Sequence, residues 1–166
     1  KAKVSQKAFD LFSELNVMNH TEVESRYEIE LEEYSKKVQI EGRVLGDIVR
    51  NHIIPTAFKY QNLLIENIKG LKEIFGAEYE QYAGEQILIL KKISMHINEL
   101  NSKLHAMQDA RKAANAMSSA EEMAHAYCDN VKPYFDEIRY HADKLELMVD
   151  NELWTLTKYR ELLFTR

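Results

Sequence analysis

Three polar side chains that interrupt apolar helical stripes have the clearest chemical potential: Glu41, His52 and His141. A buried carboxylate that faces an imidazole can titrate near neutral pH or bind a metal ion. The structural alternative is a satisfied polar pair that fixes how neighbouring helices are aligned. We favour the structural alternative and leave open whether the three residues meet in the core.

A second candidate is Glu122-Met123-Ala124-His125, which matches the Glu-x-x-His motif of di-iron helical bundles. Such a site needs the motif on two helices and two further inward carboxylates, and this sequence has no second copy. Glu122 and His125 also lie off the apolar stripe of their helix. A solvated helix face is therefore the preferred interpretation.

The sequence lacks other catalytic signatures. It has no glycine-rich phosphate loop, nucleophile elbow, paired cysteines or cluster of acids with metal-ligand spacing. Cys128 is the only cysteine, and we expect a small core residue rather than a nucleophile. A single cysteine also suits the reducing cytoplasm. We expect no catalytic, cofactor-binding or metal-binding residues in this chain.

Composition limits both the fold and the partners. The 166 residues include only 5 Gly and 2 Pro, and so few turn residues favour long helices over a fold of many strands. No apolar run reaches the roughly 18 residues that a bilayer span needs. The net charge of -5 and the scattered basic pairs argue against binding to a phosphate backbone. We expect a soluble, all-α chain without nucleic-acid or membrane partners.

Apolar periodicity predicts a short helix over residues 4–15 and then a first long helix. The apolar side of the short helix is formed by Phe9, Leu11, Phe12 and Leu15. A capping box at 21–24, Thr-Glu-Val-Glu, should begin the long helix. Pro55 should kink it, and Gly76 should end it. Its expected seam is Tyr27, Leu31, Tyr34, Val38, Glu41, Leu45, Ile48 and His52.

Two further long helices are predicted. The second carries the cleanest heptad spacing, at Leu90, Ile93, Ile97, Leu100, Leu104 and Met107. Ser118 and Ser119 each precede a glutamate by three residues, so the third helix should begin there and bend at Pro133. Its stripe is Met123, Tyr127, Val131, Tyr134, Ile138, His141, Leu145 and Met148.

These elements predict an all-α fold: an elongated antiparallel bundle of three long helices, one of them kinked at a proline, plus a short N-terminal helix and a docked C-terminal tail. Residues 1–166 would form a single helical domain. Gly42 and Gly46 form a small-x-x-x-small pair, which weakly suggests the close approach of another backbone. The tail is too apolar to stay free in water, since it contains Trp154, Leu156, Tyr159, Leu162, Leu163 and Phe164.

Four blocks of sequence are more specific than a helical repeat. They are ESRYEIELEEY at 24–34, the Pro55-containing stretch at 43–76, VKPYFDEIRYHADKLELMVDNELW at 131–154 and KYRELLFTR at 158–166. Together they resemble the C-terminal region of type III glutamine synthetases, in register over nearly the whole chain. The tail departs from the family at Thr155 and Thr157, where prolines flanking Leu156 would be expected.

The resemblance implies that the chain is the C-terminal fragment of a larger enzyme of nitrogen metabolism. The parent would be an ATP-dependent glutamate–ammonia ligase that uses Mg or Mn and a γ-glutamyl phosphate. Its catalytic residues would lie in an upstream barrel, and its subunits would form stacked hexameric rings in the cytoplasm. The fragment itself would hold no cofactor and no catalytic activity. Its role would be structural, in contact with the barrel of the same chain and with neighbouring subunits.

Two alternatives stay open at this point. The chain could be a stand-alone, coiled-coil-like adaptor that binds protein partners along its apolar seam. It could also be a metal-binding four-helix bundle. The absence of an initiator Met before Lys1 favours a piece of a longer protein, which is what the first hypothesis expects.

Overall fold

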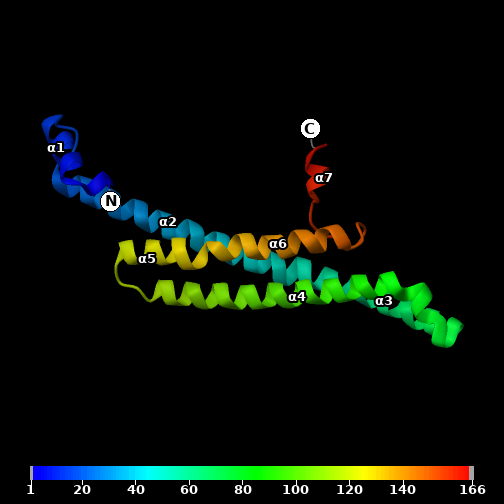
Figure 1. The fold of residues 1–166 in the computed structure, drawn as a ribbon. Helices are drawn as coiled ribbons and strands as arrows, with labels where there is room; N and C mark the ends of the chain where they lie inside the picture. Colours follow the sequence, from blue (N-terminus) through cyan, green and yellow to red (C-terminus); the bar gives the residue numbers. More distant parts are fainter. Residues whose placement is uncertain (1, 165–166) are drawn as a thin grey trace. The chain divides into compact units, whose positions relative to one another are not determined.

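The computed structural model describes residues 2–164, and in this range it contains helices and no strand (Figure 1), which confirms the all-α prediction. The elements in chain order are η1 (Ala2–Val4), α1 (Gln6–Glu14), α2 (His20–Ile48), η2 (Val49–Ile53), α3 (Ile54–Phe75), η3 (Gly76–Glu78), α4 (Tyr79–Asn115), α5 (Ala120–Ala126), η4 (Tyr127–Val131), α6 (Pro133–Met148) and α7 (Tyr159–Leu162). Segments η1 and η3 are 3-10 helices, and η2 and η4 are π-helices. None of the helices between residues 2 and 164 combines the length and the apolar character of a membrane span.

The chain divides into two compact units. Unit 1 comprises Lys1–Gly42 and Met107–Pro133, and unit 2 comprises Arg43–Ala106 and Tyr134–Arg166. Each unit has its own apolar core. The core of unit 1 includes Val23, Val38, Met107, Ala114, Ala124, Ala126, Tyr127 and Val131. The core of unit 2 includes Val49, Ile53, Ala57, Leu64, Ala83, Ile93, Ile97, Leu100, Leu104, Ile138, Leu145 and Val149.

Side-chain hydrogen bonds fix the antiparallel direction of α3 and α4 within unit 2. The Gln61 amide donates to the Ser94 hydroxyl at 2.8 Å, and six residues later the Asn67 amide donates to Gln86 at 2.6 Å. The partner on α4 therefore moves backward as the residue on α3 moves forward. This confirms the predicted antiparallel arrangement for these two helices.

The predicted heptad of α4 forms the centre of the helical packing. Ile93, Leu100 and Leu104 are fully buried, and Ile97 is 4% exposed. Met107, the last residue of the run, is fully buried in unit 1. Leu90 is half-buried. The 3-4-3-4 spacing identified this face because it keeps one stripe of side chains pointed at the neighbouring helices.

Both prolines follow a π-helical segment in the same way. The backbone N–H of Ile54, just before Pro55, donates to Val49, five residues earlier. The N–H of Lys132, just before Pro133, donates to Tyr127 at 3.0 Å, again five residues earlier. Proline lacks an N–H, and its ring clashes with the carbonyl four residues before it. The predicted disturbances at the prolines are thus accommodated by one widened turn, a π-bulge, ahead of each.

The first long helix begins earlier than its predicted capping box. The Glu22 N–H donates to Asn19 Oδ1 at 2.9 Å, and the Asn19 N–H donates to Glu22 Oε2 at 2.7 Å. The box is therefore Asn19–Glu22, and the prediction at residues 21–24 was wrong. Residues 19–22 and residues 21–24 both have the spacing of a capping box. The earlier box provides acceptors for the first free N–H groups of a helix that starts at His20. The predicted helix start at Ser119 is confirmed, since the Ser119 hydroxyl accepts a hydrogen bond from the Glu122 N–H at 3.4 Å.

The short N-terminal helix is less covered than its sequence suggested. Phe9 stacks on the His20 ring with centroids 3.9 Å apart, and Phe12 is half-buried. Leu11 and Leu15, predicted on the same apolar side, are exposed. No residue of α1 is buried.

Two glycines give opposite predictions for stability. Gly46→Ala should raise the free energy of unfolding by about 0.5–1 kcal/mol, since the helix interior favours alanine. A Cβ at Gly46 would lie 3.9 Å from Leu104 Cδ2, an ordinary contact, so the predicted close backbone approach is not found at this position. Gly76→Ala should lower the free energy of unfolding by about 1 kcal/mol or more, because Gly76 ends α3 with φ at +57°, which strains any residue with a Cβ. Urea denaturation checks both, and a destabilised Gly46→Ala protein would contradict this packing.

Candidate functional site

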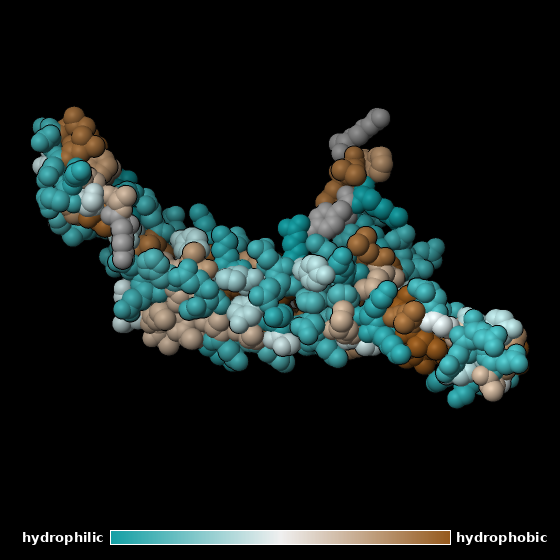
Figure 2. Space-filling view, in the orientation of Figure 1, coloured by the Kyte–Doolittle hydropathy of each residue, from teal (hydrophilic) through white to brown (hydrophobic). Residues whose placement is uncertain are grey.

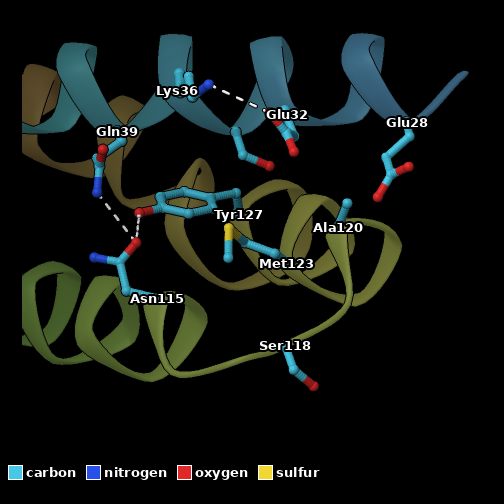
Figure 3. A pocket seen from close by; sticks show the side chains of 10 residues that line it. Glu28, Glu32, Lys36, Gln39, Asn115, Ser118, Ala120, Met123 and Tyr127 are labelled. Carbon is cyan, nitrogen blue, oxygen red and sulfur yellow. Dashed lines mark hydrogen bonds and ion pairs between the residues drawn. The ribbon is translucent and has the colours of Figure 1, made fainter. Parts of the chain in front are cut away.

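A hollow of about 380 Å³ in unit 1 lies between α2, the end of α4 and the beginning of α5 (Figure 3). The Tyr127 hydroxyl donates to Asn115 Oδ1 at 2.6 Å, and the Gln39 amide donates to the same oxygen at 3.1 Å. Tyr127 is held firmly because its ring is buried. The remaining lining residues are Glu28, Glu32, Ser35, Lys36, Ser118, Ala120 and Met123.

The lining of the hollow combines charged and apolar side chains. Glu28 and Glu32 give its edge negative charge, and Lys36 Nζ lies 3.4 Å from Glu32. Met123 and Tyr127 supply the apolar part of its lining. Residues 2–164 contain no group of three or more His, Cys, Asp or Glu side chains placed to hold a metal ion. A hollow of this kind can receive a small polar or cationic group.

A second side-chain pair in unit 1 joins Tyr34 and Cys128. Burial raises the pKa of the Tyr34 hydroxyl to about 12, and its hydrogen bond with Cys128 acts in the same direction. Negative charge on Asp129 and Glu41 adds to the increase in that pKa. Cys128 itself is exposed, so the prediction of a core cysteine was wrong. The phenol stays protonated at neutral pH and cannot serve as a base there.

Two histidines form the closest imidazole contact in unit 2. His96 Nδ1 on α4 lies 2.8 Å from His141 Nδ1 on α6. His96 is 7% exposed, and His141 is half-buried. Burial lowers the pKa of His96, and positive charge on His141 and Lys144 lowers it further, while Glu99 opposes them. His141 was a candidate from the sequence, whereas His96 was missed.

Comparison with known proteins gives a consistent family. The family model described as "Glutamine synthetase C-terminal domain" matches residues 1–72. A "Glutamine synthetase" of Bacteroides fragilis (strain YCH46) is 47% identical over 151 residues, which cover 90% of this chain and 21% of that protein. A "Type-3 glutamine synthetase" of Dictyostelium discoideum is 31% identical over 166 residues, covering 98% of this chain and 22% of the relative.

This chain is related to the C-terminal region of type III glutamine synthetases. A "Glutamine synthetase" of Butyrivibrio fibrisolvens adds a third match, 27% identical over 162 residues, covering 98% of this chain and 23% of the relative. The chain thus spans about a fifth of the length of the relatives it matches. The similarity extends beyond the family model, because the two longer alignments include nearly the whole chain.

The candidate residues of this glutamine synthetase relative are not gathered as the sequence suggested. Glu41 and His52 are both exposed, Glu41 in unit 1 and His52 in unit 2. Neither residue therefore lies in the core, where the sequence had left open a meeting of Glu41, His52 and His141. Glu122 and His125 are exposed as well, which confirms the solvated helix face.

Glycines explain why Glu41 and His52 lie outside the core. The buried positions of this helix run through Val38, Gly42, Gly46, Val49 and Ile53. The predicted seam continued from Val38 to Glu41, three residues on, whereas the buried position is Gly42, four residues on. Glycine has no apolar side chain, so the hydrophobic pattern did not mark Gly42 as buried. Since one residue corresponds to about 100° around a helix, that choice turned the predicted face toward solvent.

The C-terminal tail of this glutamine synthetase relative is held by Trp154 and Lys158. Trp154 is 9% exposed, and its ring lies 5.6 Å from Lys158 Nζ. The Lys158 ammonium is buried and donates to the carbonyls of Glu146 at 2.8 Å and Val149 at 3.3 Å, and to Asn151 Oδ1 at 2.6 Å. A cation at the end of α6 satisfies carbonyls that have no partner within the helix. The docked part of the tail therefore ends at Lys158.

Beyond Lys158 the tail exposes apolar side chains. We define the C-terminal surface as Leu147, Leu163 and Phe164, which are 80%, 80% and 84% exposed. Leu147 and Leu163 line a groove of about 820 Å³ whose wall is mostly apolar. Figure 2 shows hydrophobic atoms exposed where Figure 1 places α7. The prediction of a docked tail is confirmed for Trp154, whereas Leu163 and Phe164 do not pack on this chain and their docking on another surface stays a prediction. The side chain of Tyr159 lies outside the described part.

Proposed function

We propose that this chain is the C-terminal helical region of a larger ATP-dependent glutamate–ammonia ligase, and that its own role is structural. The parent would join ammonia to glutamate in the cytoplasm, with its catalytic residues in the preceding part of the polypeptide. The relatives named as glutamine synthetases support the parent activity, since they match nearly the whole chain and are about five times as long.

The residues of this chain do not fit the chemistry of the parent reaction. ATP-dependent ligation needs divalent metal ions held by clustered acids and positive groups on the transferred phosphate. No such group of metal ligands occurs among residues 2–164. We therefore assign ATP and its metal to the preceding part, and expect the chain alone to have no ligase activity.

The observation that carries the structural role is the C-terminal surface. A contiguous apolar surface that stays exposed on a folded chain usually marks a contact with another protein surface. Lys158 fixes the base of the tail on α6, and Leu163 and Phe164, which follow it, remain 80% and 84% exposed. We assign a neighbouring subunit of the same protein as the partner of this surface.

The experiment is to replace Leu163 and Phe164 together by aspartate in the full-length protein. Two buried charges at a subunit contact should reduce the assembly to smaller oligomers, measured by size-exclusion chromatography with light scattering. Ile74→Asp, at another highly exposed apolar position of unit 2, is the matched control and should leave the size unchanged.

Other outcomes have distinct meanings. If the double variant keeps the oligomer size but melts earlier, the surface packs on the catalytic part of the same chain. If both the oligomer size and the melting temperature are unchanged, the C-terminal surface has no structural role. The rival adaptor function predicts a native polypeptide no longer than this helical region, so the intact mass of the native protein separates the two hypotheses.

A further inference from the structure

The His96–His141 contact can exist only in certain protonation states. A hydrogen bond between two Nδ1 atoms needs one proton, which one ring donates and the other accepts. The pair can take up one additional proton at an outer Nε2 atom and keep this bond. A second additional proton places an N–H on both inner nitrogens, and two positively charged rings then face each other at 2.8 Å. The contact must open to accept it.

The charges that act on His96 do not compensate for its burial. Lys144, three residues after His141, adds positive charge, while Glu99, three residues after His96, is exposed and compensates only in part. The Tyr140 ring meets the His141 ring edge-on, with centroids 5.1 Å apart, and brings no negative charge at neutral pH. Because His96 is buried, water cannot readily replace the lost hydrogen bond, and opening the contact costs free energy.

A neighbouring polar contact between α4 and α6 contains no imidazole. Lys103 Nζ lies 2.6 Å from Glu137 Oε2, and this carboxylate raises the pKa of Lys103. Protonation of a histidine does not remove either member of this ion pair.

We infer that the His96–His141 pair is an acid-sensitive contact, which holds α6 against α4 at neutral pH and opens in mild acid. The lowered pKa of His96 has the corresponding sign, because the folded state binds protons less readily than the unfolded chain. The stabilisation is complete above the ordinary histidine pKa of about 6.5 and is lost as the pH falls below it. Opening would loosen α6, which is the helix to which Lys158 attaches the tail.

The test compares melting temperatures of the full-length protein at pH 7.5 and 5.5. His96→Gln and His141→Gln can retain a hydrogen bond but cannot take up a proton. Each should reduce the acid-induced decrease in melting temperature by about 2–4 °C relative to wild type. His125→Gln is the control, because His125 is an exposed histidine of unit 1, and it should leave the decrease unchanged.

Histidine 15N NMR of the wild-type protein gives a second readout that does not depend on the variants folding. As the pH falls from 7.5, the second imidazole of the pair should take up its proton at a lower pH than the first, and the contact should open when it does. The inference is overturned if both rings titrate near 6.5, or if both glutamine variants keep the full acid-induced decrease. It is also overturned if a chelator abolishes that decrease, because the pair would then be a metal site.

Discussion

Trp154→Ala should lower the free energy of unfolding by roughly 3–5 kcal/mol, the cost typical of removing a buried aromatic side chain. The indole is 9% exposed and lies beside the Lys158 ammonium that closes the end of α6. Without it, both the apolar packing and the shielding of the three Lys158 hydrogen bonds are lost. Chemical denaturation followed by helical circular dichroism measures the change.

Trp154→Phe is the matched control for this prediction. The indole Nε1 atom is buried and has no hydrogen-bond partner among the described residues. Replacing it with carbon should therefore remove no hydrogen bond, and the cost should be about 1 kcal/mol, from lost volume alone. Equal losses for phenylalanine and alanine would show that the indole N–H has a partner in solution, and that the tail is held differently.

Ile97→Ala should cost about 2–5 kcal/mol, because a well-packed helical core closes only partly around a deleted side chain. Ile97 lies in the middle of the buried run of α4 and is 4% exposed. Met95→Ala, two residues away on the same helix and 49% exposed, should stay within about 0.5 kcal/mol of wild type. A cost below about 1 kcal/mol for Ile97→Ala would mean that this face of α4 is not core.

Where the hydrophobic pattern is dense, the sequence predicts the fold closely. Ile93, Ile97, Leu100 and Leu104 are buried as their spacing requires, and Gly76 ends α3 as expected. Asn19 and Glu22 show the limit of such patterns at helix ends, since two overlapping capping boxes satisfy the same rule.

The tail shows a second limit. Counting apolar residues predicted a docked tail, but it did not reveal that the docking at the end of α6 is made by Trp154 together with the ammonium of Lys158. An apolar pattern contains no information on the free carbonyls at the end of α6, which attract that lysine. Leu163 and Phe164 stay exposed, although they are among the most apolar residues of the segment.

The histidine pair shows most clearly which features the sequence determines and which features only the tertiary structure determines. By itself the sequence established an all-α chain, the buried face of α4, the antiparallel order of the long helices and the position of His141 on an apolar stripe. Only the tertiary structure decided that His141 meets His96 and not a carboxylate. The contact matters for His96, because positive charge on His141 contributes to the lowered pKa of His96. Periodicity specifies which side of a single helix is buried, but the residue across the interface depends on how two helices are aligned lengthwise, and packing sets that alignment.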